Sequence, residues 1–214
     1  MKHLTKLLAT GLIALAAQGT QAQTVNAWNL SRDMMNSSTQ GPVWYFMSQD
    51  MSQDLNAKGG SYTLMNQYQS SCRNDVSTQC WLNTLYNTLY IGVIKPTTTA
   101  PTPYNLPRGA IHLHPDDTQR AVIGWKAPRA GTFLFSGMIA SLNQCGWYPD
   151  GLVWALKTST QTLRAPSQVT AMGEITFTQS VTLSAGSMVY LSIDKNQSYS
   201  CDGATVDLIV TTSN

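Results

Sequence analysis

The sequence predicts an all-β protein whose antiparallel strands form a β-sandwich. Segments that alternate apolar and polar residues recur from residue 109 to residue 208, each five to eight residues long. Turn residues separate them at intervals of about ten residues, and a proline-glycine corner, Trp125-Lys-Ala-Pro-Arg-Ala-Gly131, interrupts the series. This spacing is typical of antiparallel sheets and leaves no room for the helices of βαβ units.

The first half of the chain is less regular, and residues 23–70 are expected to form short irregular or helical elements. Residues 41–47 form an aromatic strand, and residues 49–54 form a helical turn or an exposed loop. Residues 81–94 are expected to lead from a loop or helical turn into a β-branched strand. The Pro- and Thr-rich segment 95–103 is interpreted as a surface crossover loop within one sandwich, with a linker as the alternative.

The second half gives a clearer strand pattern. Strands are expected over residues 109–115, 121–125, 132–137, 189–194 and 206–210. Ala127-Pro-Arg-Ala-Gly131 predicts a tight turn, and Ser184-Ala-Gly186 predicts another before the strand that begins at Met188. Alternation places Phe133 and Phe135 on the same face of their strand, which we expect to be buried.

The N-terminus has the pattern of a signal peptide. Met1 to Lys6 is basic, Leu7 to Ala17 is apolar, and small residues precede a cleavage point after Ala22, with Ala16 or Ala17 as alternatives. The apolar run is about half the length that spans a bilayer, and no later segment is longer. We therefore expect cleavage of residues 1–22, one domain over residues 23–214, and a secreted or periplasmic protein without a membrane span.

Cleavage would leave the chain almost uncharged. Lys and Arg fall from 13 to 11 when Lys2 and Lys6 are removed, against 11 Asp and Glu. Without a basic cluster, a nucleic-acid partner or an anionic membrane surface has little electrostatic support. Surface polarity then comes mainly from uncharged side chains, which suits neutral ligands but is also ordinary for exported β-proteins.

The four cysteines are Cys72, Cys80, Cys145 and Cys201, an even number that favours disulfides in an oxidising compartment. Three connectivities are open, and we prefer Cys72 with Cys80 and Cys145 with Cys201. The first pair closes a short loop, and the second ties together two loops far apart in sequence. No CxxC motif supports a metal site.

Several motifs occur in an order that carries a family resemblance: Gly41-Pro-Val-Trp-Tyr45, Ile111-His-Leu-His-Pro115, Ala121-Val-Ile-Gly-Trp125, Ala127-Pro-Arg-Ala-Gly131, Leu183-Ser-Ala-Gly186 and Cys201-Asp-Gly203. Over most of the mature chain they resemble exported bacterial jelly-roll domains of the carbohydrate-binding-module type. The resemblance implies a jelly-roll sandwich, with carbohydrate binding as a family tendency. Ser187 stands where Asp is expected and Asp116 where Gly is usual, so cation binding near either is not implied.

Two loops, residues 143–151 and 194–203, form the candidate site because the Cys145–Cys201 disulfide would join them into one rim. The predicted ligand-binding residues are Trp147, Tyr148, Asp150, Tyr199 and Asp202. Exposed rings pack against the CH groups of sugars, and nearby carboxylates and amides bind hydroxyls. The alternative is that the rings cap the core and the disulfide only pins the loops.

Metal binding is the less favoured interpretation at two places. Asp150, Asp194 and Asp202 offer oxygen ligands for Ca²⁺, but they lack a regular D-x-D-x-D-G spacing, and Asp before Gly is common in turns. His112 and His114 point the same way from one strand and would need Asp116 or Asp117 as a further ligand, so a half-buried polar edge is favoured. We expect no cofactor, with Ca²⁺ as the alternative.

Three classes of function follow from these features. The preferred one is a lectin-like protein that binds a glycan or cell-surface polysaccharide without intrinsic catalysis. The alternative is a structural or interaction subunit, such as an adhesin, matrix or secretion-associated protein, whose aromatic and Met-rich N-terminal part covers a partner or a second copy. The residues assigned to that surface are Met34, Met35, Trp44, Tyr45, Phe46, Met47 and Met51.

A small glycan hydrolase is the least favoured class. Glycoside hydrolysis needs two facing carboxyl groups, and the only glutamate, Glu174, lies in a strand-like segment. Asp150 with Asp202 is the pair that remains for such a reaction. The sequence also lacks the Gly-x-Ser-x-Gly motif of serine hydrolases.

Overall fold

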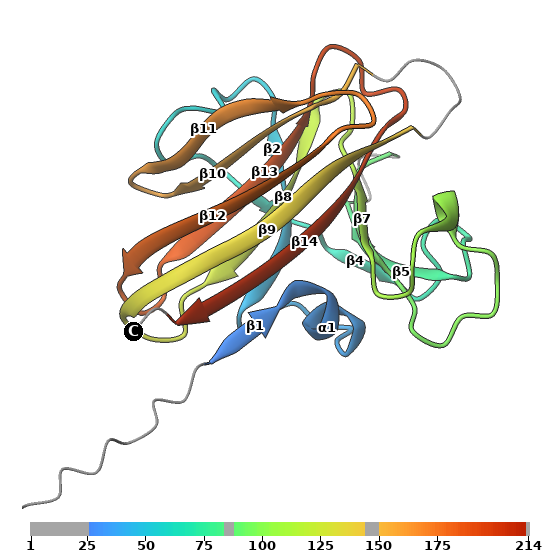
Figure 1. Cartoon of the computed structure of the whole chain (residues 1–214), viewed down its shortest axis with the longest axis horizontal. Helices are drawn as coiled ribbons and strands as arrows, with labels where there is room; N and C mark the ends of the chain where they lie inside the picture. The colour runs from blue at the N-terminus through green and yellow to red at the C-terminus, as the bar shows by residue number, and fades with distance from the viewer. Residues whose placement is uncertain (1–25, 84–87, 144–149, 213–214) are drawn as a thin grey trace, which may run out of the picture.

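Two antiparallel sheets form the protein in the computed structural model, which describes residues 26–83, 88–143 and 150–212. The larger sheet contains, in order, β12 (Glu174–Leu183), β9 (Gly131–Asn143), β14 (Asp202–Thr212), β7 (Ile111–His114), β6 (Tyr90–Ile94), β5 (Thr78–Leu82) and β4 (Gln67–Gln69), with β1 (Ala27–Asn29) also paired to β14. The smaller sheet contains β11 (Thr162–Val169), β10 (Leu152–Thr158), β13 (Met188–Lys195), β8 (Gln119–Lys126), β2 (Trp44–Asp50) and β3 (Thr63–Leu64). Figure 1 shows the long strands β9, β12 and β14 lying side by side. The predicted antiparallel β-sandwich is confirmed.

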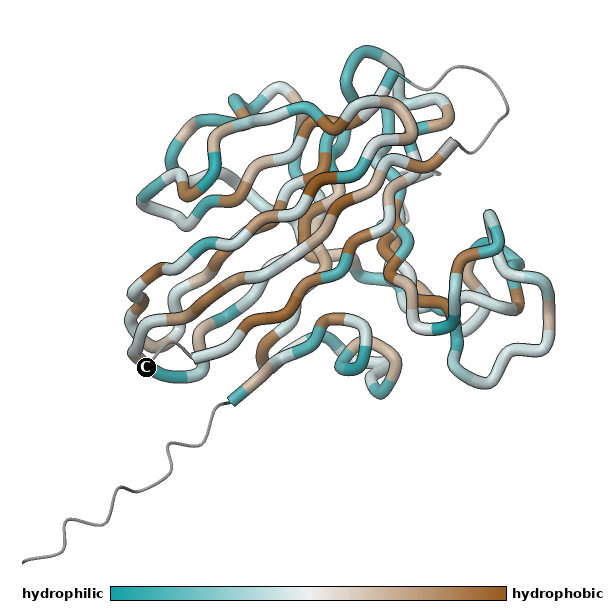
Figure 2. Tube along the Cα trace, in the orientation of Figure 1, coloured by the Kyte–Doolittle hydropathy of each residue, from teal (hydrophilic) through white to brown (hydrophobic). Residues whose placement is uncertain are grey.

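The core lies between the sheets and is filled by alternate residues of each strand. Phe133 and Phe135 of β9 are fully buried, as their alternation predicted, and Trp125 of β8 is 1% exposed. The Trp125 ring lies 4.9 Å from the ring of Phe133 and 5.3 Å from that of Phe135, both edge-on. Figure 2 shows hydrophobic segments recurring along these strands. This alternation is expected when one face of a strand packs and the other meets solvent or a covering loop.

The corner at residues 127–131 is a short turn, as predicted, and it joins the two sheets. β8 pairs with β13 and β2, whereas β9 pairs with β12 and β14. The segment at residues 184–187 likewise connects β12 of the larger sheet to β13 of the smaller one. The physical reason is that Trp125 and Phe133 meet across the core, which requires their strands to lie in opposite layers.

The N-terminal part consists of short elements, as predicted. β1 pairs with the end of β14, and the helix α1 (Leu30–Met35) follows directly. In Figure 1 β1 lies beside the C-terminal end of β14, and α1 lies next to β1 along the side of the sheet. The aromatic strand is confirmed as β2, and the chain turns after Asp50. Within the described ranges, no helix has both the length and the apolar character needed to cross a bilayer.

Residues 51–62, which we call the covering loop, are held on the outer face of the smaller sheet by Arg120 of β8. Arg120 is 3% exposed and forms an ion pair with Asp194 at 2.6 Å. Its guanidinium also donates to the Gln49 Oε1 atom at 3.1 Å and to the Met51 carbonyl at 3.2 Å. One buried cation therefore links β8, β13, β2 and the first residue of the loop.

Lys157 of β10 holds the middle of the covering loop. Its side chain is buried, and its Nζ atom donates to the carbonyls of Leu55 and Ala57, both at 3.3 Å. Burial lowers the pKa of Lys157. Tyr62, near the end of the loop, stacks on Tyr190 with 3.9 Å between ring centroids. The loop is therefore packed on the sheet by polar and aromatic contacts.

Candidate functional site

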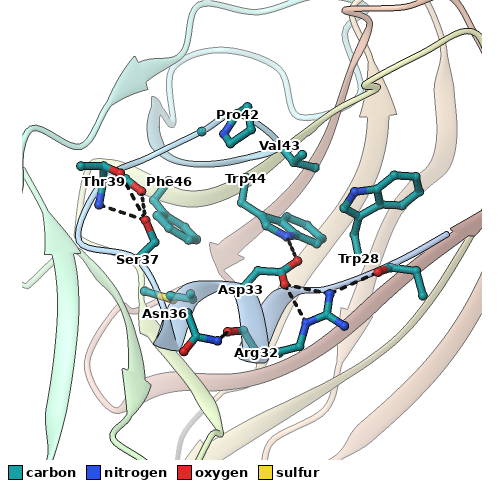
Figure 3. A pocket seen from close by; sticks show the side chains of 13 residues that line it. Trp28, Arg32, Asp33, Asn36, Ser37, Thr39, Pro42, Val43, Trp44 and Phe46 are labelled. Carbon is teal, nitrogen blue, oxygen red and sulfur yellow. Dashed lines mark hydrogen bonds and ion pairs between the residues drawn. The ribbon is translucent and has the colours of Figure 1, made fainter.

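A cleft of about 420 Å³ lies between α1 and the start of β2 (Figure 3). Its walls combine indole rings, other apolar side chains and a set of charged and amide groups. The lining residues are Ala27, Trp28, Arg32, Asp33, Met34, Asn36, Ser37, Thr39, Gly41, Pro42, Val43, Trp44 and Phe46. We call it the N-terminal cleft. Clefts of this size with few, fixed polar groups are the usual form of small-ligand sites.

The polar groups of the N-terminal cleft form one connected chain. The Trp44 indole N–H donates to the Asp33 Oδ2 atom at 2.9 Å, and the Arg32 guanidinium pairs with the Asp33 Oδ1 atom at 2.8 Å. Arg32 also donates to the Ala27 carbonyl at 3.1 Å. Figure 3 shows these groups lying in a row. The carboxylate of Asp33 is thereby held in a fixed orientation and its charge is balanced.

Local capping places these side chains. The Asn29 side chain accepts a hydrogen bond from the Arg32 backbone N–H at 2.8 Å, which caps the start of α1. At the other end, Asn36 donates from its amide to the Arg32 carbonyl at 2.8 Å. The chain then turns back toward β2 through Gly41, whose φ of +85° favours glycine. The helix and the strand therefore face each other across the cleft.

The aromatic walls are anchored in the core. Trp28 is half-buried, and its ring lies 5.4 Å from Trp125 and 6.0 Å from Phe133. Trp44 is 6% exposed and is held by its bond to Asp33. These rings cannot reorient freely, so little conformational entropy is lost when a ligand packs against them.

A second cavity of about 310 Å³ lies on the outer face of the larger sheet. It is lined by Cys72, Arg73, Asp75, Thr78, Thr88, Tyr90, Pro103, Tyr104, His112 and His114. The predicted same-side orientation of His112 and His114 is confirmed, and both are buried, at 3% and 8% exposure. The Tyr90 hydroxyl lies 3.0 Å from the His112 ring nitrogens. No tryptophan lines this cavity, and its volume is smaller than that of the N-terminal cleft.

Burial decides the charge of the histidines in this second cavity. It lowers the pKa of His112 to about 3, helped by His114 and opposed by Asp75. Burial also lowers the pKa of His114. Burial alone would raise the pKa of Asp75, but hydrogen bonds from Thr78 and Ser77 outweigh it and lower that pKa. At neutral pH the cavity therefore presents two neutral imidazoles beside a carboxylate.

The predicted rim is described only in part. Trp147 and Tyr148 lie outside the described residues, and Tyr199 is half-buried. Asp150 Oδ2 accepts the backbone N–H groups of Gln197 and Ser198 at 3.1 and 2.9 Å. Asp150 therefore fastens the loop after β13, and ligand binding by these rim residues stays a prediction.

Asp202 of the predicted rim is buried rather than solvent-facing. Its exposure is 0%, and neither carboxyl oxygen has a hydrogen-bond partner. Burial raises the pKa of Asp202 to about 7, and the charge of Asp150 acts in the same direction. The Asn196 backbone amide and Lys195 favour the charged form to a smaller extent. The residue was predicted as a surface ligand from its position before Gly203, which does not reveal the direction of the side chain.

The structure tests one of the two predicted disulfides. Cys72 and Cys80 form a disulfide with an S–S distance of 2.06 Å, as predicted. Cys201 is also disulfide-bonded. Cys145 lies outside the described residues, so its predicted pairing with Cys201 stays a prediction. Among the described residues, no group of three or more His, Cys, Asp or Glu side chains lies close enough together to hold a metal ion.

The partner-covering surface predicted for the N-terminal part was wrong for most of its members. Met34, Trp44, Phe46 and Met47 are between 3% and 8% exposed. Three of them, Met34, Trp44 and Phe46, belong to the main core cluster. The apolar pattern of this segment reflects core packing of α1 and β2.

The N-terminal cleft was missed by the sequence interpretation. A signal was present in Asn29-Leu-Ser-Arg-Asp-Met-Met35, where an N-cap residue precedes a short polar-apolar turn. The contact of Asp33 with Trp44, 11 residues later, depends on the turn at residues 36–43 and is not visible in local patterns.

Comparisons with known proteins give no family. No family model and no curated protein matches the chain. Solved structures that resemble it include the C-terminal CBM6 of a marine laminarinase from Zobellia galactanivorans, at 16% identity over 48% of this chain and 80% of that one, with a TM-score of 0.30. The K1 adhesin domain of Lys-gingipain from Porphyromonas gingivalis W83 is 14% identical over 90% and 99%, with a TM-score of 0.40. A CBM35 from Paenibacillus barcinonensis is 11% identical over 70% and 100%, with a TM-score of 0.34. At these TM-scores the similarities assign neither a family nor a function to this chain.

Proposed function

We propose that this protein binds a carbohydrate, without intrinsic catalysis, in the N-terminal cleft. The observation that carries the proposal is the chain of contacts that joins an indole to a carboxylate and a guanidinium in one cleft, Trp44 to Asp33 to Arg32. Sugars present CH groups on one face and hydroxyls at the edge, so they need a ring and fixed polar groups together.

The polar groups retain capacity for a ligand. The Arg32 side chain is 55% exposed and that of Asp33 is 26% exposed. Each carboxylate oxygen accepts about two hydrogen bonds. Asp33 Oδ1 already meets both Nε and Nη2 of Arg32, whereas Oδ2 accepts only the indole N–H of Trp44 among the described residues. A sugar hydroxyl can therefore donate to Oδ2 of Asp33 and accept from the exposed guanidinium of Arg32 without breaking the existing contacts.

The charge balance of the cleft selects the class of ligand. Arg32 and Asp33 neutralise each other at 2.8 Å, and they are the only charged residues lining the cleft in the described part of the chain. A charged ligand would meet no uncompensated counter-charge there. A neutral glycan fits this environment better than an acidic or a basic ligand.

The rim of Trp147, Tyr148, Asp150, Tyr199 and Asp202 remains our second proposed contact surface for a glycan. It would act through its rings, since Asp150 binds loop amides and Asp202 is buried. The two surfaces make separate predictions, because each is tested by substitutions of its own residues.

We also propose export, with residues 1–22 removed and residues 23–214 folding as one domain that is secreted or periplasmic. The Cys72–Cys80 disulfide supports an oxidising compartment. An exported glycan-binding protein would meet its ligand on a cell surface or in the surrounding medium.

Glycan-array binding followed by calorimetry on the best ligand tests this function. Arg32→Ala should weaken binding roughly ten- to 100-fold, because hydrogen bonds to charged groups are worth about 1.5–3 kcal/mol. Arg129→Ala, an exposed arginine at the corner between β8 and β9, is the matched control and should bind like the wild type. Trp28→Phe keeps a ring in the core and should weaken binding less than Arg32→Ala.

The outcomes separate the alternatives. Loss of binding in Trp147→Ala with full binding in Arg32→Ala would move the site to the rim. If the folded wild-type protein binds no glycan on a broad array, glycan binding is refuted. If the protein converts a bound glycan into a product, the absence of catalysis is refuted.

A further inference from the structure

Asp202 occupies a position where a carboxylate is not expected. Side chains of β14 alternate between the two faces of the sheet, and Asp202 shares its face with Ala204, Val206, Leu208 and Val210. Those four residues are 0–2% exposed and belong to the core. The Asp202 carboxylate therefore points into the interior at the end of the sandwich.

Neither oxygen of this carboxylate has a hydrogen-bond partner. The Asn196 backbone amide favours the charged form of Asp202, but at a geometry short of a hydrogen bond. Burying an ionised carboxylate without a partner is among the most costly arrangements in a protein. An ionised Asp202 therefore requires a positive partner at this position.

A second carboxylate that has an oxygen without a hydrogen-bond partner lies near Asp202. Asp150 lies close enough for its charge to act on Asp202. The Oδ1 atom of Asp150 is buried and without a partner, while Oδ2 accepts loop amides. Three unpartnered oxygens on two carboxylates are thus gathered at one end of β14 and β10.

Neighbouring basic side chains are already engaged. Lys195 pairs with Asp117, and Arg120 pairs with Asp194 at 2.6 Å. Two carboxylates carry a charge that one divalent cation would balance. Since the available donors are all carboxylate oxygens, Ca²⁺ fits better than Zn²⁺, which prefers nitrogen and sulfur, and its flexible coordination suits two fixed side chains better than the octahedral geometry of Mg²⁺.

We propose that Asp202 and the Oδ1 atom of Asp150 bind one Ca²⁺ ion, with backbone carbonyls and water completing the shell. Through Asp150, which also binds the amides of Gln197 and Ser198, the ion ties residues 195–201 to the starts of β10 and β14. The site is separate from the N-terminal cleft and does not depend on glycan binding.

Calorimetric titration of chelator-treated protein with CaCl₂ tests the proposal. The wild type should bind one ion per chain, and its Tm should rise by roughly 5–10 °C at a Ca²⁺ concentration about 100 times Kd. Asp202→Asn should lose the isotherm and the Tm rise. Asp207→Asn, an exposed residue on the same strand, is the matched control and should keep both.

Measurements on the wild-type protein alone can refute the proposal. If its Tm and titration curve do not respond to Ca²⁺, Asp202 is held as the neutral acid and no ion site exists. A Ca²⁺ response that persists unchanged in Asp202→Asn would place the ion elsewhere and would equally refute it. Unfolded Asp202→Asn protein would leave the wild-type titration as the deciding measurement.

Discussion

Replacing Arg120 with Met should destabilise the protein more than any surface charge change. The Arg120 side chain is 4% exposed and its partner Asp194 is 13% exposed. Met fills much of the same volume but leaves Asp194 buried without its cation and removes the donors to Gln49 and Met51. Removing one member of a buried pair costs about 3–5 kcal/mol.

Urea unfolding at pH 7, followed by tryptophan fluorescence, measures this loss. With an m-value of about 2 kcal/mol/M, the midpoint should fall by roughly 2 M. The exposed pair Arg32–Asp33 gives the comparison, because Arg32→Ala should cost less than about 1 kcal/mol. In the double variant Arg120→Met/Asp194→Asn the unpaired charge is gone, so part of the stability should return.

A loss below about 1 kcal/mol in Arg120→Met would refute the reasoning, since the value would then match that of surface pairs. A double variant that is no more stable than Arg120→Met would also refute it. In that case the contacts to the covering loop, and not the unpaired carboxylate, would account for the loss.

Three further predictions concern packing, the disulfide and acid stability. Gly137→Ala should lose about 1–3 kcal/mol of unfolding free energy, because its Cβ would lie 2.7 Å from the ring of Phe177; an unchanged urea midpoint would contradict this. Replacing Cys72 and Cys80 together by Ser should cost about 2–3 kcal/mol, because the closed loop is short; calorimetry measures this, and an unchanged Tm would contradict it. His112 has its pKa lowered to about 3, so its stabilising contribution is complete above the unfolded pKa and is lost as pH falls from about 6.5 toward 3; His112→Asn should therefore lose less stability than the wild type between pH 7 and 4, and equal losses would refute the assignment.

The sequence predicted the positions of the strands better than it predicted which strands pair with each other. The alternating pattern correctly predicted that Phe133 and Phe135 are buried, because the face of the strand on which a side chain lies depends only on its position in the strand. The turn at residues 127–131 was predicted, but turn residues show only that the chain bends and not which sheet the next strand joins. Pairing of β8 with β2, about 75 residues apart, is decided by the packing of Trp125 and Trp44 against the core.

The sites were predicted less well for a related reason. The N-terminal cleft brings Trp28 and Trp44 together only because β1 pairs with the end of β14 and α1 folds back toward β2. Asp202 was predicted as a ligand-binding residue of the rim from its place in the loop at residues 194–203, whereas its side chain is buried at the start of β14. Both features depend on contacts between distant parts of the chain.

The central place of β14 bears on how the chain folds. The last described strand lies between β9 and β7 and also pairs with β1 near the other end of the sequence. Until residues 202–212 are available, β9 and β7 each have an open edge, and the larger sheet is divided into two parts. The chain loses loop-closure entropy before these long-range strand contacts can stabilise it. We therefore expect slow folding, on the order of milliseconds to seconds. A chain shortened before β14 would present unpaired strand edges, which promote aggregation.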